Sequence, residues 1–304
     1  MPAPISKFFF GATLIALRKK DGGVRPIAVG CVMRRMISTA ASHEVRERAA
    51  KLLSPRQIGI GIADGATAAA HAARRFLSSC DANNGLLKLD FKNAFNAVDR
   101  AQVLKEVNTH FPELAPYVYA AYGSSSYLFF GEHKLDLAHG VQQGDPLGPL
   151  LFSLAIHPST YTVNCSFAVW YLDDGTIGGF AQEVIDSFKC VESGCSKIGL
   201  ELNISKCEVI SGDASFCNQV SAQLPGCRIV APNNAELLGA PLGQAAADES
   251  LSKKAAGLHE IRARLKTIER HDALAVLRVS LGHPKAIYSL RSGPAFRIRK
   301  VTQI

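Results

Sequence analysis

The segment "YLDDG", residues 171–175, decides how this sequence is interpreted, because it places two carboxylates, Asp173 and Asp174, directly after an apolar segment. The residues before it, "SFAVW" at 166–170, predict a buried strand. An ionised carboxylate is costly to remove from water unless it is paired or bound to a metal, and two together raise each other's pKa. A hairpin turn is the simplest explanation, since Asp-Gly is a common turn dipeptide. The segment alone leaves a turn and a metal site open.

A second predicted strand also ends in an acid. "LLKLDF", residues 86–91, finishes in Asp90, which lies 83 positions before Asp173. If the two strands are neighbours in an antiparallel sheet, three carboxylates share one volume, which is unfavourable without cations. Mg²⁺ accepts a few carboxylates and keeps water and phosphate oxygens as its other ligands. Two such ions about 3.5–4 Å apart can hold both oxygens of an in-line phosphoryl displacement. Because successive strand residues point to opposite faces, we expect Asp173 to be the main ligand and Asp174 to lie nearer the edge.

Composition predicts a folded protein without a membrane span. The chain has 304 residues, of which 47% are hydrophobic, enough for one large domain or two ordinary ones. No apolar run approaches the roughly 20 residues of a transmembrane helix, and no basic region precedes the first apolar run, so we expect no signal peptide. The eight cysteines show neither a CxxC motif nor zinc spacing. We therefore expect reduced thiols in an intracellular protein of the cytoplasm, the nucleus or both.

Charge is segregated along the chain. Residues 18–56 carry a net charge of +7 and residues 253–304 one of +9, whereas residues 57–252 carry −9. Basic ends around an acidic middle indicate a polyanion held from two sides and acidic metal ligands at the centre.

The order of predicted elements is mixed α and β, without a regular βαβ alternation. Two strands are expected within 8–30, around a loop at Asp21, and Asp64 is a candidate helix cap. Pro146 is expected near the first position of a helix over 145–158. Trp170 is expected in the core, as is a helical stripe formed by Val184, Phe188, Val191, Cys195 and Ile198.

Five motifs in family order resemble those of reverse transcriptases, and the resemblance runs from about residue 8 to the C-terminus. "YLDDG" resembles the Y-x-D-D signature, and "LDFKNAFNAVDR" (89–100) resembles the first catalytic motif. "GVQQGDPLGPLLFSLAI" (140–156), "GLELNISKCEVI" (199–210) and "AELLGAPLG" (235–243) are similar to the motifs that follow. Upstream, "KKDGGVRPIAVGCVMRRMIS" (19–38) looks like the fingers of non-LTR retrotransposon polymerases. Y-x-D-D alone is a weak pattern, whereas the ordered set is specific.

The resemblance implies an α+β right-hand polymerase fold with an antiparallel palm sheet, fingers and a partial thumb. Residues 1–250 would form the fingers (mainly 1–85) and palm (mainly 86–250), and residues 251–304 the start of a basic, helical, thumb-like region. The implied activity is RNA-directed DNA polymerisation. It adds dNTPs to a primer 3′-OH on an RNA or DNA template and uses two Mg²⁺ ions, with Mn²⁺ able to replace them. The implied partners are an RNA template, a DNA primer and other domains of a retroelement polyprotein, with no membrane.

The resemblance also implies roles for individual residues. Asp90 and Asp173 would bridge the metals, Asp174 would assist, and the backbone carbonyl of Phe91 would be a further ligand. Lys19 and Arg25 would hold the incoming triphosphate.

Four further positions follow from the same motifs. Gln143 and Gly144 would lie beside the nascent base pair and template. Lys206 would protonate the leaving pyrophosphate. Leu238 and Gly239 would form a hairpin that supports the primer. Phe95, five positions after Asp90, would lie beneath the ribose and exclude a 2′-hydroxyl, although packing in the core is an alternative for this ring.

Two alternative functions remain open at this stage. A palm-type RNA-dependent RNA polymerase would share the carboxylates, but Tyr171 and Phe95 argue against it, since such enzymes usually carry Gly-Asp-Asp and a small or polar gate. An inactive or co-opted nucleic-acid-binding relic is the other, and the presence of Asp90, Asp173 and Asp174 weighs against it. We expect a fragment of a larger polyprotein, because neither an endonuclease nor a full thumb is seen.

Overall fold

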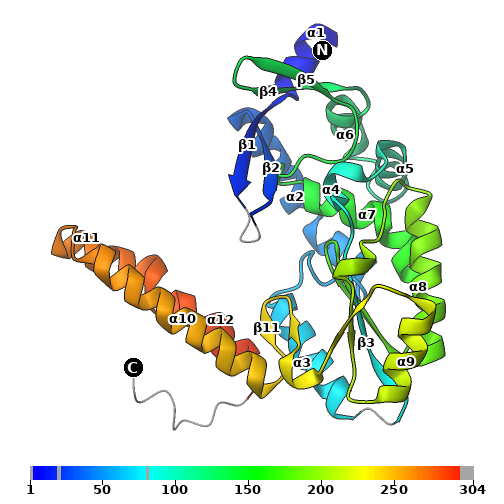
Figure 1. Ribbon diagram of the computed structural model, residues 1–304. Helices are drawn as coiled ribbons and strands as arrows, with labels where there is room; N and C mark the ends of the chain where they lie inside the picture. Colours follow the sequence, from blue (N-terminus) through cyan, green and yellow to red (C-terminus); the bar gives the residue numbers. More distant parts are fainter. Residues whose placement is uncertain (1–2, 19–21, 80–81, 295–304) are drawn as a thin grey trace.

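A computed structural model describes residues 3–18, 22–79 and 82–294. The chain forms a small upper sheet, a central sheet flanked by helices, and a long helical extension that projects to one side (Figure 1). The mixed helix and sheet content agrees with the predicted α+β class. No helix within these ranges has both the length and the apolar character needed to cross a membrane.

The upper sheet has the strand order β2-β1-β4-β5. β1 (Ala12–Arg18) and β2 (Val24–Gly30) form the antiparallel pair expected within 8–30, and β4 (Ser126–Phe130) adds to β1 in parallel before turning into β5 (His133–Leu137). Phe8 is not in a strand, contrary to the prediction, but in the helix α1 (Ala3–Phe9). Its ring packs 4.9 Å from that of Tyr127, so the apolar run covers β4 instead of extending β1.

The central sheet has the order β6-β7-β3-β8-β9 and is antiparallel except for its last pair. Its strands are β3 (Asn84–Leu89), β6 (Phe167–Tyr171), β7 (Asp174–Phe180), β8 (Glu208–Ile210) and β9 (Arg228–Val230). Glycines in β7 allow tight packing: a Cβ at Gly178 would lie 2.4 Å from the Leu86 side chain.

Alternate residues of the central sheet enter two separate cores. Leu87 and Ile177 face the larger core, whereas Leu86 and Ile210 face a smaller one, as the two-residue period of a strand requires. The larger core is covered by α2 (Val32–Leu53), α5 (Arg100–His110), α7 (Gly148–Tyr161), α8 (Ala181–Ser196) and α9 (Ala214–Gln223). The smaller core is covered by α3 (Gly65–Ser78) and by the hairpin of β10 (Glu236–Leu237) and β11 (Ala240–Pro241).

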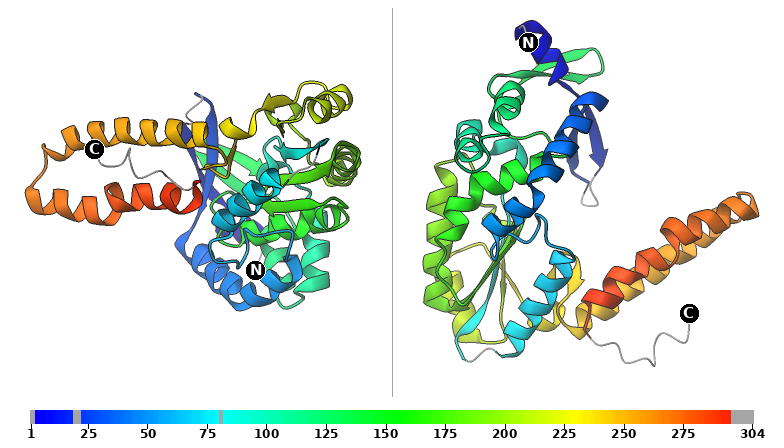
Figure 2. Two further views of the ribbon diagram at one scale, coloured as in Figure 1. Left: turned by 90° about the horizontal axis from the view of Figure 1, so that it is seen from below. Right: turned by 180° about the vertical axis from the view of Figure 1, so that it is seen from behind.

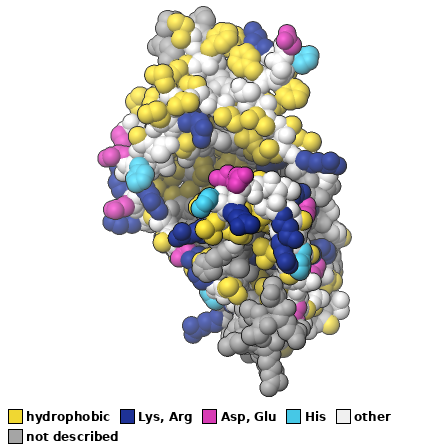
Figure 3. Space-filling model, turned by 90° about the vertical axis from the view of Figure 1, so that its left-hand side faces the viewer, with side chains coloured by type: hydrophobic (Ala, Val, Ile, Leu, Met, Phe, Trp, Pro, Cys, Tyr) yellow, Lys and Arg dark blue, Asp and Glu magenta, His cyan; other side chains and the backbone are white. Residues whose placement is uncertain are grey.

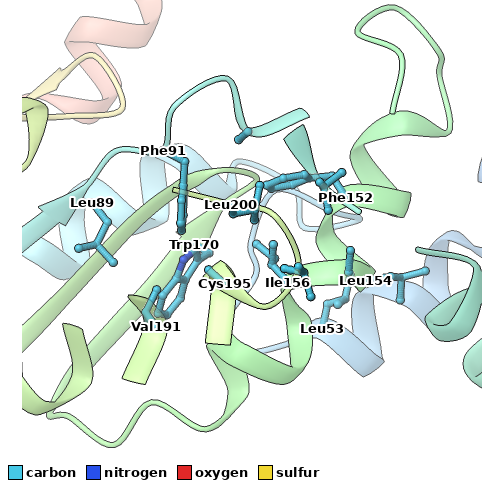
Figure 4. Close-up of a cluster of buried hydrophobic side chains, with 14 of the residues drawn as sticks. Leu53, Leu89, Phe91, Phe152, Leu154, Ile156, Trp170, Val191, Cys195 and Leu200 are labelled. Atoms are coloured by element: carbon cyan, nitrogen blue, oxygen red, sulfur yellow. The ribbon is translucent and has the colours of Figure 1, made fainter. Parts of the chain in front are cut away.

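The predicted core residues are confirmed. Trp170 is fully buried between β6 and α8, and Val191 and Cys195 of α8 lie beside it (Figure 4). Val184 and Phe188 are buried on the same face of α8, and Ile198 follows just after the helix.

The structure confirms the position of one predicted helix start and corrects another. Asp64 occupies the N-cap position of α3 as predicted, but its side chain makes no capping hydrogen bond and instead forms an ion pair with Arg291 at 2.7 Å. α7 begins at Gly148 with Pro149 in its first turn, so Pro146 lies in the preceding turn. This turn is held by Asp145, whose carboxylate accepts a hydrogen bond from the Leu147 N–H at 3.0 Å.

The helical extension is an antiparallel arrangement that leaves the central sheet beside β11 (Figures 1 and 2). It contains α10 (Gln244–Leu265), α11 (Arg270–Val276), a π-helical turn (Leu277–Leu281) and α12 (His283–Ser292). α10 continues through residue 250. The boundary that we predicted there, between the palm and the thumb-like region, stays a prediction. The remaining short elements are α4 (Ala94–Ala97), α6 (Ala115–Tyr122) and two 3₁₀ turns (Ile204–Lys206 and Pro232–Asn234).

The seven cysteines within the described ranges are free, as expected. Cys80 lies outside those ranges.

Candidate active site

The register of two central strands brings the separated acids to one edge of the sheet. Leu89, the last residue of β3, pairs with Gly175 of β7. Asp90 follows Leu89 and Asp174 precedes Gly175, so the two acids occupy the next position of the same ladder. The sequence predicted that the two acidic strand ends would meet, and they do. The neighbour of β3 is β7, whereas β6 lies beyond it at the sheet edge.

Asp173 lies in a tight hairpin that joins β6 to β7. Tyr171 pairs with Asp174, which leaves Leu172 and Asp173 as the two loop residues. The turn and the acidic cluster therefore coexist, although the turn residues are Leu172 and Asp173, not Asp174 and Gly175. Leu172 has a φ of 58°, a left-handed conformation that a branched side chain rarely adopts. Such strain persists only where the surrounding structure holds it.

The acids of this hairpin repel one another and Asp90. Loss of solvation raises the pKa of Asp173, Asp90 raises it further, and Arg25 opposes the change. Loss of solvation, Asp173 and Asp90 together raise the pKa of Asp174 to about 6, although this side chain keeps one exposed side. Negative charge therefore accumulates at this edge, and a bound cation would relieve it.

The donor set suits a hard cation, but the described residues form no closed cage. Within the described ranges, no group of three or more His, Cys, Asp or Glu side chains is close enough to form a ready-made metal site. Mg²⁺ does not need such a cage, since water and substrate phosphates complete its octahedron. The prediction of two Mg²⁺ ions, or Mn²⁺ in their place, therefore fits these carboxylates and stays a prediction.

Phe91 is buried and forms an isolated antiparallel bridge with Leu202. The Asn203 N–H donates to the Asp90 carbonyl at 2.7 Å, and the Lys92 N–H donates to the Glu201 backbone carbonyl at 2.8 Å; these two hydrogen bonds make the bridge. The Phe91 carbonyl takes no part in this bridge, and its role as a metal ligand stays a prediction.

A polar hollow of about 350 Å³ opens beside Asp174. Asp90, Asp174 and the exposed Lys206 line it together, so the structure brings these three predicted residues into one space. It is also lined by Lys88, Leu89, Ser205, Glu208 and Arg228. Burial opposes ionisation of Glu208, but ion pairs with Lys88 and Arg228 outweigh it and lower its pKa.

Arg25 lies at the exposed end of β2, and its positive charge partly offsets the rise in the pKa of Asp173 and of Asp174. The hairpin of β1 and β2 therefore places a cation near the acids. Lys19, its predicted companion, lies outside the described residues, as does Asp21.

Gln143 and Gly144 lie in the loop before α7, against β2. The Ala28 N–H donates to the Gln143 carbonyl at 3.0 Å. Gly144 has a φ of 121°, and a Cβ there would lie 2.7 Å from the Ala28 carbonyl oxygen, so only glycine fits. The side-chain oxygen of Gln143 is buried and has no hydrogen-bond partner among the described residues.

A buried polar network fixes this loop, and the sequence did not reveal it. Arg34 of α2 forms an ion pair with Asp145 at 2.8 Å, and the Tyr122 hydroxyl donates to the same carboxylate at 2.7 Å. Burial and Asp145 raise the pKa of Tyr122, so this group is a hydrogen-bond donor at neutral pH. The sequence offered one indication of this network, because Asp145 directly follows the predicted site residues Gln143 and Gly144. Nothing local distinguishes Arg34 from the exposed Arg35.

Phe95 is half-buried in α4. Its ring stacks on Phe152 with centroids 4.6 Å apart, and Phe152 lies in the larger core. Core packing therefore accounts for one face of the ring, and the role as a sugar gate stays a prediction.

Leu238 and Gly239 form the two-residue turn between β10 and β11, with positive φ values of 52° and 74°. A Cβ on Gly239 would meet nothing within 4 Å in the described part of the chain, so the tip is open to a ligand. The Tyr288 hydroxyl of α12 donates to the Leu238 carbonyl at 2.8 Å and ties this tip to the helical extension.

A palm-like sheet with acids at one edge, a basic upper hairpin and a lateral helical extension define the right-hand polymerase class. Comparison with known proteins agrees. The sequence matches the family model described as "Reverse transcriptase (RNA-dependent DNA polymerase)" over residues 17–242. The chain therefore belongs to the reverse transcriptase family, and the prediction of an RNA-directed DNA polymerase domain is confirmed.

One curated relative is the "Retrotransposable element SLACS 132 kDa protein" of Trypanosoma brucei gambiense. The two are 29% identical over 217 residues, which cover 67% of this chain and 18% of that protein. The predicted resemblance to reverse transcriptases of non-LTR retrotransposon type is thereby confirmed. The family match also favours a reverse transcriptase over the RNA polymerase alternative.

Solved structures similar to the chain include two yeast telomerases, each in complex with a TWJ fragment of telomeric RNA. The telomerase of Candida albicans superposes with a TM-score of 0.53 at 11% identity, covering 79% of this chain and 45% of that one. The telomerase of Candida tropicalis gives a TM-score of 0.53 at 12% identity, covering 68% and 42%. At these identities the similarity shows the fold alone, and it confirms the predicted right-hand fold.

Proposed function

We propose that this chain is a catalytically competent polymerase that adds dNTPs to a primer 3′-OH on an RNA or DNA template. The observation that carries the proposal is the β3–β7 register, which places Asp90 beside Asp174 and the Asp173 turn. Asp90 and Asp173 would hold two Mg²⁺ ions, or Mn²⁺ in their place, and Asp174 would assist at the exposed side. When bound, the ions would stabilise negative charge on the reacting phosphate oxygens.

The cations around this edge have separate proposed roles. Arg25 interacts electrostatically with Asp173 and Asp174, and it would bind the triphosphate of the incoming nucleotide. Lys206 is exposed on the hollow shared with Asp90 and Asp174, where it would give a proton to the leaving pyrophosphate.

The neutral residues would position the nucleic acid. The side-chain oxygen of Gln143 is buried and has no partner within the described part of the chain, which supports a contact with a ligand at the nascent base pair, because an unpaired buried acceptor is unfavourable. Gly144 would let the template approach, and the open Leu238–Gly239 tip would support the primer. Phe95 would exclude a 2′-hydroxyl, which makes the product DNA.

The proposed partners are an RNA template, a DNA primer and other domains of a larger retroelement polyprotein. The chain spans 18% of the length of its curated relative, whose name describes a retrotransposable element. Lys and Arg side chains gather across the middle of the face shown in Figure 3, and hydrophobic side chains prevail above them, over the upper sheet. The cations could bind the phosphate backbone of a nucleic acid, and the apolar side chains could pack against its bases.

Primer extension by the purified chain on an RNA template with Mg²⁺ and dNTPs tests the proposal. Extension that requires a divalent cation and is lost in Asp173→Asn would support it. Salt-dependent duplex binding without any extension would overturn it in favour of a nucleic-acid-binding relic.

A further inference from the structure

Gln57 is a buried amide that holds the backbone of the catalytic hairpin from both sides. It lies between α2 and α3 and is only 2% exposed. Its side-chain nitrogen donates to the Leu172 carbonyl at 3.1 Å, and its side-chain oxygen accepts from the Leu172 N–H at 2.7 Å. The same oxygen accepts from the Gly59 N–H at 3.0 Å. The amide thus binds both backbone groups of the one strained loop residue.

The segment around Gln57 lies along the open edge of β6. The Trp170 N–H donates to the Arg56 carbonyl at 2.7 Å, and the Ile58 N–H donates to the Trp170 carbonyl at 2.8 Å. A Cβ on Gly59 would lie 3.0 Å from the Leu172 nitrogen, so a glycine at this position lets the segment approach the turn. The segment that carries Gln57 is therefore fixed to the edge of the central sheet by backbone hydrogen bonds.

The hydrogen bonds from Gln57 to Leu172 affect the position of the neighbouring carboxylate. Leu172 adjoins Asp173, and its φ of 58° is unfavourable for leucine without external support. If Leu172 returned to a negative φ, the peptide plane entering Asp173 would rotate and its carboxylate would move relative to Asp90. We propose that Gln57 is a positioning residue that holds Asp173 in the cation-binding arrangement. This proposal deepens the proposed polymerase function and rests on it for the cation.

Gln57→Met is the decisive variant, because methionine keeps the length and approximate volume but removes the three hydrogen bonds of the side-chain amide. The matched control is Val103→Ala, which loses packing in a fully buried position of α5, a helix that packs mainly against α6 and α7. Both variants should lose stability. Only Gln57→Met should affect the hairpin.

The first measurement needs no metal. Relative to core amides elsewhere in the chain, backbone hydrogen exchange in the segment 166–180 should accelerate at least about tenfold in Gln57→Met and stay unchanged in Val103→Ala, because only the former releases the Leu172 N–H. Because glycine adopts a positive φ without strain, Gln57→Met should have a smaller effect in a Leu172→Gly background. Equal exchange in Gln57→Met and the wild type, or equal acceleration in both single variants, would overturn the proposal.

The second measurement is the affinity of the protein for Mn²⁺, by titration calorimetry. It should fall at least about tenfold in Gln57→Met and less than about twofold in Val103→Ala, while primer-template affinity stays similar in both. Wild-type affinity for Mn²⁺ in Gln57→Met would overturn the positioning role. A wild-type protein that binds no Mn²⁺ would instead overturn the proposed function, and the exchange data would still decide whether Gln57 holds the turn.

Discussion

Asp90 and Asp174 are brought to the same edge of the central sheet because their neighbours, Leu89 and Gly175, pair across β3 and β7. The site is therefore a property of strand register. A slip of one residue would turn one of the two acids to the opposite face of the sheet. The buried Leu86 and Leu87 on opposite faces of β3 fix that register, since each must enter its own core.

Asp173→Asn should abolish nucleotide addition and slightly stabilise the cation-free protein. Asparagine keeps the shape but loses the charge that would bind a cation. The folded-state pKa of Asp173 is raised, so its ionised form destabilises the folded state at pH 7, and this penalty disappears as the pH falls. We expect a melting temperature higher by roughly 1–3 °C without metal. Thermal unfolding and primer extension check both parts, and full activity in this variant would contradict the metal assignment.

Phe95→Val should relax the choice of sugar. If the ring excludes the 2′-hydroxyl, rNTP incorporation should rise at least about tenfold relative to dNTP incorporation, which corresponds to about 1.4 kcal/mol. Phe152→Leu is the matched control, because it disrupts the same stacked pair from the buried side and leaves the Phe95 ring in place. Competition between dNTP and rNTP on one primer-template measures the ratio. An unchanged ratio with a loss of stability in both variants would show that Phe95 only packs.

Gly144→Ala should slow extension without unfolding the protein. The new Cβ would lie 2.7 Å from the Ala28 carbonyl oxygen at a φ of 121°, which forces the Gln143 loop away from β2. We expect at least about tenfold slower extension, because misplacement of a positioning group is costly. Gly131→Ala is the control, since that glycine also has a positive φ of 56° but meets nothing within 4 Å among the described residues. Equal activity of the two variants would exclude a special role for Gly144.

Binding of an RNA/DNA duplex should weaken steeply with salt, and the helical extension should contribute to the slope. The double change Arg262→Gln and Lys266→Gln removes two exposed cations at the end of α10. It should reduce the salt slope by up to about 2, because each neutralised phosphate contributes about 0.7–0.9. Lys189→Gln with Lys197→Gln is the matched control, since both lie at α8 on the far side of the sheet (Figure 1). A salt slope equal in both double variants would argue against contact by α10.

The sequence by itself determined which acids form the candidate site and which class the fold belongs to. Asp90 and Asp173 each follow an apolar segment, and alternating burial within β3 follows from its pattern of leucines. The helical stripe on α8 and the burial of Trp170 were also predictable, because a single element carries the whole signal. The ordered motifs identified the family for the same reason, since each depends only on residues close in the chain.

Only the tertiary structure decided how the site is held in place. Gln57 binds Leu172 across 115 positions, and Arg34 binds Asp145 across 111. Asp64 occupies the predicted N-cap position of α3, but its carboxylate pairs with Arg291, which lies 227 positions away, and does not cap the helix. Local sequence sets backbone preference and the face that is buried. The partner of a polar side chain, by contrast, depends on which distant segment packs against it, and that is settled only when both cores close.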